Sequence, residues 1–149
     1  MLKINQAQPV DIPELCRLLA ILFKQEKEFQ PDSHRQQRGL QLIIENPLLG
    51  AIWVARQELQ IVGMVSLLYS VSTALGGRVA TLEDMLVDTN FRDRQIGSRL
   101  LAHAINAARE AGCLRVSLLT DRDNLKAQAF YEKQGFVHSD MQQMRLLFD

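Results

Sequence analysis

The fold of this chain is decided by residues 85–101, which read MLVDTNFRDRQIGSRLL. The opening apolar residues indicate a strand, and Ile96, Leu100 and Leu101 recur at the spacing of a helix. A basic turn that contains Gly97 lies between the two. A helix that begins at such a turn leaves its first backbone N–H groups unpaired and directs the positive end of its dipole toward the turn. The segment therefore predicts a site for an anionic ligand such as a phosphate.

The same segment resembles the acyl-CoA-binding motif of the GNAT superfamily of N-acetyltransferases. That motif runs Arg or Gln, two residues, Gly, one residue, and Gly or Ala. Here it begins at Arg92 and ends at Gly97, with Gln95 in place of the first glycine. A second stretch, residues 124–136, reads NLKAQAFYEKQGF and resembles the Asn, Ala, Phe-Tyr, Gly-Phe element found later in that superfamily. Two motifs in the expected order are stronger evidence for the family than one glycine pattern alone.

This resemblance implies an α/β (α+β) fold, in which a central mixed and mostly antiparallel sheet is flanked by helices. A splayed pair of parallel strands would form the cleft for CoA. It also implies acetyl-CoA as cosubstrate, with the pantetheine arm on the backbone of the strand and the pyrophosphate on the turn. The cofactor-binding residues expected from it are Met85, Leu86, Val87, Arg92, Asp93, Arg94, Gln95, Ile96, Gly97, Ser98 and Asn124.

Gln95 decides how closely the turn can follow the superfamily pattern. Glycine adopts a positive φ freely, whereas most other residues resist it by about 1 kcal/mol. If Gln95 begins the helix with ordinary dihedral angles, CoA binding is retained, whereas a required positive φ would weaken the site. We expect binding to be retained, because the rest of the turn and the later motif agree with the pattern.

Acetylation of a primary amine requires an acceptor for the ammonium proton, since such an amine has a pKa near 10.4. Glu83 and Asp84 interrupt an apolar strand directly before the pantetheine-binding stretch. Consecutive strand residues point to opposite faces, so one of these carboxylates can face the cleft. Residues 82–87 (LEDMLV) also resemble the corresponding strand of polyamine acetyltransferases, and this likeness assigns the base to Glu83. The alternatives are structural ion pairs at these carboxylates, or water as the proton relay.

The resemblance assigns Tyr131 as the general acid that protonates the departing CoA thiolate. A phenol has a reference pKa of about 10, so this transfer would be nearly balanced. Adjacent helical positions lie about 100° apart. We therefore expect Phe130 to face the core and Tyr131 to face the reacting groups. The alternative is that Tyr131 simply packs beside Phe130.

Periodicity elsewhere predicts the remaining elements. Alternation predicts strands at residues 2–6, 51–55, 60–72, 79–87 and 116–120, the last parallel to the strand before the turn. Helical spacing predicts a helix after Asp11, one capped by Asp32 or Ser33, one from Ile96 that ends near Gly112, and one over residues 125–134. The stretch 137–147 is expected to return as a final strand or hairpin.

Composition limits the classes of partner. The 149 residues most simply form one domain, residues 1–149. Lys+Arg and Asp+Glu both number 17, so no overall charge attracts nucleic acid or a membrane surface. Two separated cysteines and three separated histidines predict neither a disulfide framework nor a metal site. Without a signal-peptide pattern or an apolar run near the roughly 20 residues of a membrane span, a cytoplasmic protein is expected.

The resemblance to the GNAT superfamily implies an N-acetyltransferase that moves the acetyl group of acetyl-CoA to a primary amine by direct attack in a ternary complex. A small-molecule amine is favoured, and Glu26, Glu28 or Asp32 could attract it. One alternative is a catalytically inactive acyl-CoA-binding regulatory module, which the replacement at Gln95 keeps open. Another is acetylation of a protein N-terminus or lysine. A homodimer through the final strand is a further expectation.

Overall fold

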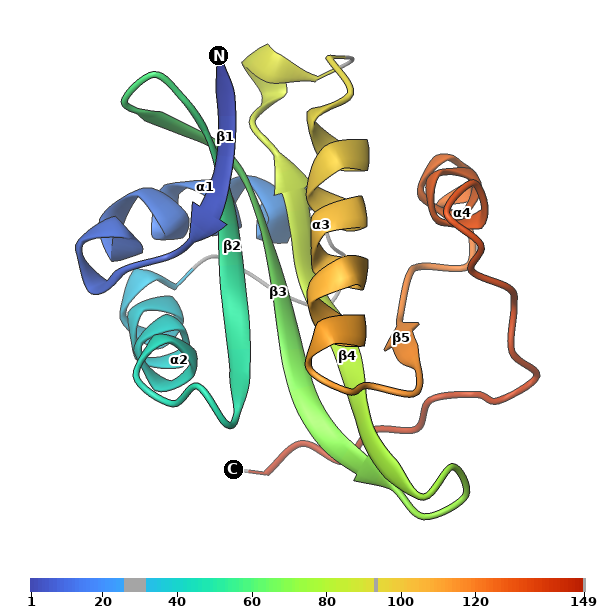
Figure 1. The fold of residues 1–149 in the computed structure, drawn as a ribbon. Coiled ribbons are helices and arrows are strands. Elements are labelled where there is room, and N and C mark those ends of the chain that lie inside the picture. The colour runs from blue at the N-terminus through green and yellow to red at the C-terminus, as the bar shows by residue number, and fades with distance from the viewer. Residues whose placement is uncertain (26–31, 93, 149) are drawn as a thin grey trace. The chain divides into compact units, whose positions relative to one another are not determined.

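The computed structural model describes residues 1–25, 32–92 and 94–148, and Figure 1 shows their arrangement. In chain order the elements are β1 (Leu2–Gln6), η1 (Pro9–Asp11), α1 (Ile12–Gln25), α2 (Ser33–Ile44), β2 (Gly50–Gln57), β3 (Gln60–Ser72), β4 (Gly77–Val87), η2 (Thr89–Phe91), α3 (Ile96–Glu110), β5 (Val116–Leu118) and α4 (Leu125–Glu132). Two compact units contain them, Met1–Leu119 and Thr120–Asp149, and each is described by itself.

The first unit is built on a five-stranded sheet with the strand order β1-β2-β3-β4-β5. The pairs from β1 to β4 are antiparallel, and β5 is parallel to β4. The parallel register begins at Ala80 opposite Val116 and ends at Leu82 opposite Leu118, whereas β4 continues to Val87. β4 therefore extends past its parallel partner, which agrees with the predicted mixed sheet and its diverging parallel pair.

Different helices cover the two faces of this sheet (Figure 1). α1 and α2 pack on one face, in a core cluster that includes Leu15, Leu18, Leu40, Ile52 and Met64. α3 covers the other face, where the rings of Trp53 and His103 meet edge-on with centroids 5.7 Å apart. Ile52 and Trp53 are neighbours in β2, and strand alternation sends them to opposite faces. Both faces of the central strands are thus buried.

The helix termini follow local signals in the sequence. The side chain of Asp32 accepts hydrogen bonds from the backbone N–H groups of His34 and Arg35, at 3.1 and 3.2 Å, and so caps α2. Hydrogen bonding to the Arg35 backbone is the main reason that the pKa of Asp32 is lowered. Of the two predicted caps for this helix, the residue used is Asp32.

The C-terminal segment differs from the sequence prediction. Residues 137–148 contain neither a strand nor a hairpin, and Met141, Met144 and Leu147 are exposed. The predicted final strand is therefore wrong. Met141 and Met144 are three residues apart and are separated by two glutamines. This spacing does not give the alternation that would bury one face of a strand.

No helix among the described residues combines the length and the apolar character needed to cross a membrane. Within the same residues, no group of three or more His, Cys, Asp or Glu side chains is arranged to hold a metal ion.

Candidate functional site

The predicted phosphate-binding turn connects β4 to α3 in the first unit. Asp88 begins it, accepting a hydrogen bond from the Asn90 N–H at 3.1 Å through its side chain and one from the Phe91 N–H at 2.9 Å through its carbonyl. α3 then begins at Ile96, and the N-cap residue Gln95 makes no side-chain hydrogen bond to it. The first N–H groups of α3 thus receive no hydrogen bond from their N-cap side chain, and they lie at the positive end of the helix dipole, where an anionic group is stabilised. Asp93, also predicted here, lies outside the described residues.

Gln95 adopts the left-handed conformation, with φ 61° and ψ 15°. Of the two cases considered for Gln95, the structure therefore has the positive φ and not the ordinary dihedral angles. On the other side of the turn, Arg92 is extended, with φ −69° and ψ 159°. The strain of about 1 to 2 kcal/mol is present before any ligand arrives. It therefore lowers the stability of the fold while leaving the N–H groups of α3 in place.

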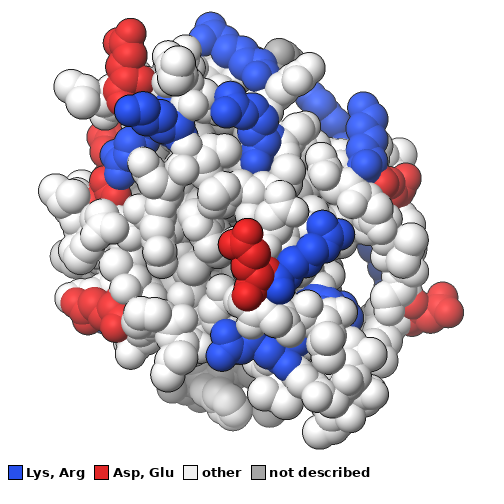
Figure 2. Space-filling view, in the orientation of Figure 1, with Lys and Arg blue, Asp and Glu red and all other residues white. Residues whose placement is uncertain are grey.

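Positive side chains surround this turn. Arg92 and Arg94 are exposed, as is Arg99 in the first turn of α3. The Nε of Arg92 donates to the Val87 carbonyl at 3.3 Å, and the guanidinium of Arg94 lies 5.2 Å from the centre of the Phe91 ring. In the space-filling view, Lys and Arg side chains gather at the top, the end at which Figure 1 draws the turn into α3 (Figure 2). Local positive charge suits a pyrophosphate.

The part of β4 that precedes the turn offers a main-chain edge. Met85 and Val87 are half-buried, and Leu86 is buried in the core between the sheet and α1. β3 pairs with this part of β4 on one side, while β5 pairs with β4 no further than Leu82. An extended ligand with amide groups can add to such an edge as a strand would. The three predicted pantetheine-binding residues thus lie on a strand edge that β5 leaves open.

A β-bulge changes the placement of the two carboxylates. Val65 of β3 pairs with Met85 and Leu67 pairs with Leu82, so Glu83 and Asp84 together lie opposite the single residue between Val65 and Leu67. The regular alternation on which the sequence argument relied is interrupted here. That the two carboxylates point to opposite faces stays a prediction, and the structure shows only that Glu83 is the more exposed of the two.

Ser66 is the residue opposite this bulge. It is fully buried, two residues from Met64 and hence on the face covered by α1 and α2. Its Oγ accepts a hydrogen bond from the Asp84 N–H at 3.1 Å and donates to the Asp84 Oδ2 at 3.4 Å. Asp84 is half-buried and Glu83 is exposed. The hydroxyl thus holds the bulge, and Glu83 keeps access to solvent.

The second unit carries the later motif. Asn124 caps α4, because its Oδ1 accepts a hydrogen bond from the Ala127 N–H at 3.1 Å. This structural role accounts for an asparagine here and leaves its amide N–H groups for a ligand. The predicted CoA contact of Asn124 stays a prediction.

Tyr131 packs within this unit against Phe130 and Phe136, with ring centroids 5.2 and 5.7 Å away. Phe130 and Tyr131 are both half-buried, so the structure does not assign one to the core and the other to the surface. Burial raises the pKa of Tyr131 to about 12. Proton transfer to a thiolate is therefore less favourable than the reference phenol suggested, while the neutral hydroxyl is present throughout the physiological range.

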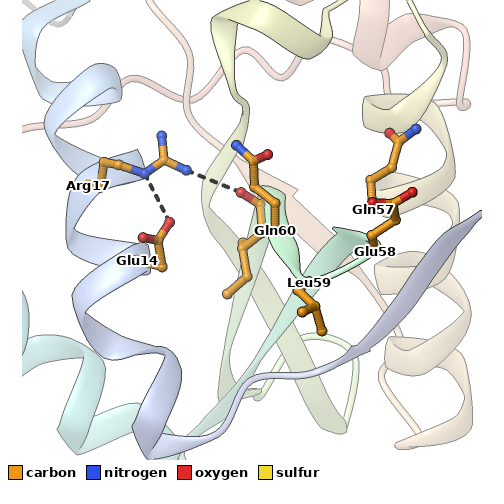
Figure 3. Close-up of a pocket in the computed structure, with 7 residues that line it drawn as sticks. Glu14, Arg17, Gln57, Glu58, Leu59 and Gln60 are labelled. Carbon is orange, nitrogen blue, oxygen red and sulfur yellow. Dashed lines mark hydrogen bonds and ion pairs between the residues drawn. The ribbon is translucent and has the colours of Figure 1, made fainter.

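A pocket of the first unit lies between α1 and the β2–β3 hairpin (Figure 3). Its lining consists of Glu14, Arg17, Gln57, Glu58, Leu59, Gln60 and Ile61, none of which was predicted as a site residue. Arg17 also reaches Asp88 at the start of the turn, with its Nη1 2.8 Å from Oδ2. The sequence argument missed this contact and that of Ser66. A polar residue inside an apolar run, as in the sequence IVGMVSLLY of residues 61–69, was the available signal for Ser66.

A sequence model described as the acetyltransferase (GNAT) family matches residues 13–136. The chain belongs to the GNAT family of acetyltransferases. The predicted family and fold, and the predicted enzyme class of acetyl-CoA-dependent N-acetyltransferase, are confirmed.

Similar proteins agree with this membership of the GNAT family. The chain is 37% identical over 67 residues to probable glucosamine 6-phosphate N-acetyltransferase 2 of Oryza sativa, a match that covers 45% of this chain and 39% of that protein. It is 26% identical over 137 residues to the aminoalkylphosphonate N-acetyltransferase of Salmonella typhimurium, covering 92% of this chain and 86% of that protein. A crystal structure of a possible acetyltransferase from Clostridium difficile has the same fold, with a TM-score of 0.89, 17% identity and coverage of 100% and 99%.

Proposed function

We propose that this GNAT protein transfers an acetyl group from acetyl-CoA to the primary amine of a small molecule. The observation that carries the proposal is the junction of β4 and α3. There, a strand edge that β5 leaves open past Leu82 leads into a helix start whose N-cap side chain makes no capping hydrogen bond. An extended amide-bearing arm and an adjacent pyrophosphate match these two features in that order.

In the proposed reaction the neutral amine attacks the thioester carbonyl, a C–N bond forms and the C–S bond breaks. The amine must first lose its ammonium proton, and we assign this proton to Glu83. Its exposed position at the bulge lets it pass the proton on to water. Ser66 supports the arrangement by holding the backbone of Asp84. Water acting alone as the relay is the competing assignment.

Tyr131 is proposed to donate to the departing sulfur. With a pKa raised to about 12, its hydroxyl is protonated over the whole range in which the enzyme would work. Complete transfer to a thiolate with a pKa of about 8.5 is uphill. Its main contribution in this proposal is therefore a hydrogen bond that stabilises the leaving group as the C–S bond breaks.

Two relatives support a small molecule as acceptor, since their names specify glucosamine 6-phosphate and aminoalkylphosphonate. Each acceptor combines an amine with a phosphorus oxyanion. At these identities the acceptor of the present protein is a proposal, as acceptor pockets vary on one fold. Of the three acidic residues considered for attracting the amine, Glu26 and Glu28 lie outside the described residues, and Asp32 caps α2.

The test measures amine-dependent release of CoA from acetyl-CoA by detecting the free thiol. The acceptors compared are small amines, aminophosphonates and lysine peptides. Glu83→Gln and Tyr131→Phe are compared with wild type, with binding of CoA measured in parallel. The proposal expects turnover with a small amine, and loss of turnover but not of CoA binding in both variants. CoA binding without turnover of any amine would instead indicate an inactive binding module. Preference for peptides would indicate a protein acceptor.

A further inference from the structure

We propose that Arg17 and Asp88 are a positioning pair for the CoA-binding turn, acting through the backbone of the turn and not by contact with CoA. The proposal rests on the proposed function in naming CoA as the ligand of that turn. The pair connects α1 to the start of the turn, across 71 positions of sequence.

Asp88 is held on several sides. Its backbone N–H donates to the Val62 carbonyl at 2.8 Å, so its main chain still belongs to the sheet. One carboxylate oxygen accepts the Asn90 N–H at 3.1 Å, and the other accepts Arg17 Nη1 at 2.8 Å. Only 7% of the side chain is exposed. The carboxylate thus fixes the first residues of the turn from inside the protein.

Arg17 makes further hydrogen bonds at its own end of the pair. Its Nη2 donates to the Ile61 carbonyl at 3.2 Å and its Nε donates to Glu14 at 3.0 Å (Figure 3). The planar guanidinium therefore contacts α1, β3 and the turn at once, which a point charge such as lysine cannot reproduce. Through it, the start of the turn is tied to the helix that covers the sheet.

The turn needs such support because it is strained. Gln95 holds a positive φ of 61° at its far end. A residue in that conformation persists only where the surrounding structure fixes the chain on both sides. Buried Ile96 fixes the end at α3, and Asp88 fixes the end at β4. Loss of the ion pair would free one of these ends, so the N–H groups that face a pyrophosphate would lose their alignment.

The chain contains a matched control for the general effect of breaking a buried ion pair. Arg56 Nη2 lies 2.7 Å from Asp11 Oδ2, with 6% of the Asp11 side chain exposed. Asp11 also accepts a backbone hydrogen bond, from the Gln8 N–H at 2.8 Å. Both pairs thus join a nearly buried, backbone-bonded aspartate to an arginine. The control pair joins η1 to β2, which contain no predicted site residue.

The experiment compares Asp88→Ala and Arg17→Met with Asp11→Ala and Arg56→Met. Dissociation constants for CoA come from calorimetry, and kcat and KM for acetyl-CoA come from the amine assay. We expect the first two variants to weaken CoA binding about tenfold and to raise KM more than they lower kcat. The control variants should lose comparable stability and bind CoA within about twofold of wild type. Asp88→Asn, which keeps an acceptor for the Asn90 N–H, should recover part of the affinity.

Unchanged CoA binding in the Asp88 and Arg17 variants would overturn the proposal, as would an equal loss in the control variants. A second readout does not depend on CoA. In the free protein, the amides of Asn90 and Phe91 should exchange hydrogen faster in Asp88→Ala and Arg17→Met than in the controls. Equal exchange would refute the pair's positioning role, and a wild-type protein that fails to bind CoA would refute the proposed function separately.

Discussion

Replacing Gln95 by glycine should stabilise the protein, because Gln95 has a φ of 61° at the N-cap of α3. Glycine removes a left-handed penalty of about 1 to 2 kcal/mol. It also adds freedom to the unfolded chain, which costs about 0.5 to 1 kcal/mol. The exposed Gln95 side chain makes no capping hydrogen bond that would be lost. We therefore expect a net gain of about 0.5 to 1 kcal/mol and a rise in Tm of roughly 2 °C.

Urea and thermal unfolding of three variants would measure this effect. Gln95→Ala keeps the Cβ and should stay within about 0.5 kcal/mol of wild type. Gly39→Ala in α2, where an added Cβ meets no atom within 4 Å, measures the effect of replacing glycine by alanine without a clash. This variant should be about 1 kcal/mol more stable than wild type. A Gln95→Gly protein no more stable than Gln95→Ala would refute the strain argument. A loss of CoA affinity in Gln95→Gly would show that the side chain itself contributes to the site.

Three further predictions concern catalysis, packing and pH. Tyr131→Phe should lower kcat by about a hundredfold and leave the dissociation constant for CoA unchanged; an unchanged kcat would remove Tyr131 from the mechanism. Gly50→Ala should destabilise the fold by about 3 kcal/mol in urea unfolding, because its Cβ would lie 2.3 Å from the Leu67 carbonyl oxygen; wild-type stability would contradict this clash. Burial raises the pKa of Asp88, but the hydrogen bonds from Arg17 and the Asn90 backbone together with nearby positive charge outweigh it, so the pKa is lowered. The ionised Asp88 therefore stabilises the fold at pH values above its pKa in the unfolded chain, about 3.9, and this stabilisation is lost as the pH falls through its lower pKa in the folded protein. The stability difference between wild type and Asp88→Asn should thus shrink below about pH 4. A difference independent of pH would contradict the assignment.

Patterns within short segments of the sequence predicted most of the fold. The apolar stripe of α3, the cap at Asp32 and the strand at β2 were each predicted from neighbouring residues, and the structure has all three. The last strand failed because the apolar residues around Met141 and Met144 do not alternate. The family resemblance supplied the mixed, mostly antiparallel sheet and its splayed parallel pair, which local periodicity alone does not predict.

The details of the candidate site depend on contacts between distant segments. The bulge at Glu83 and Asp84 exists because β4 carries one more residue than β3 across from Ser66, and that register is visible only when the two strands are paired. The contact between Arg17 and Asp88 joins residues 71 positions apart. The positive φ of Gln95 occurs at a residue type that does not favour the left-handed conformation, so the sequence alone does not indicate it. None of these features has a periodic signal.

The central claim is that the junction of β4 and α3 binds acetyl-CoA despite Gln95. Calorimetric titration of the purified protein with acetyl-CoA tests it most directly, with free CoA and dephospho-CoA as comparisons. The account predicts saturable binding in the micromolar range. Absence of binding at millimolar acetyl-CoA would contradict it and would indicate a family member that has kept the fold but lost the cofactor site.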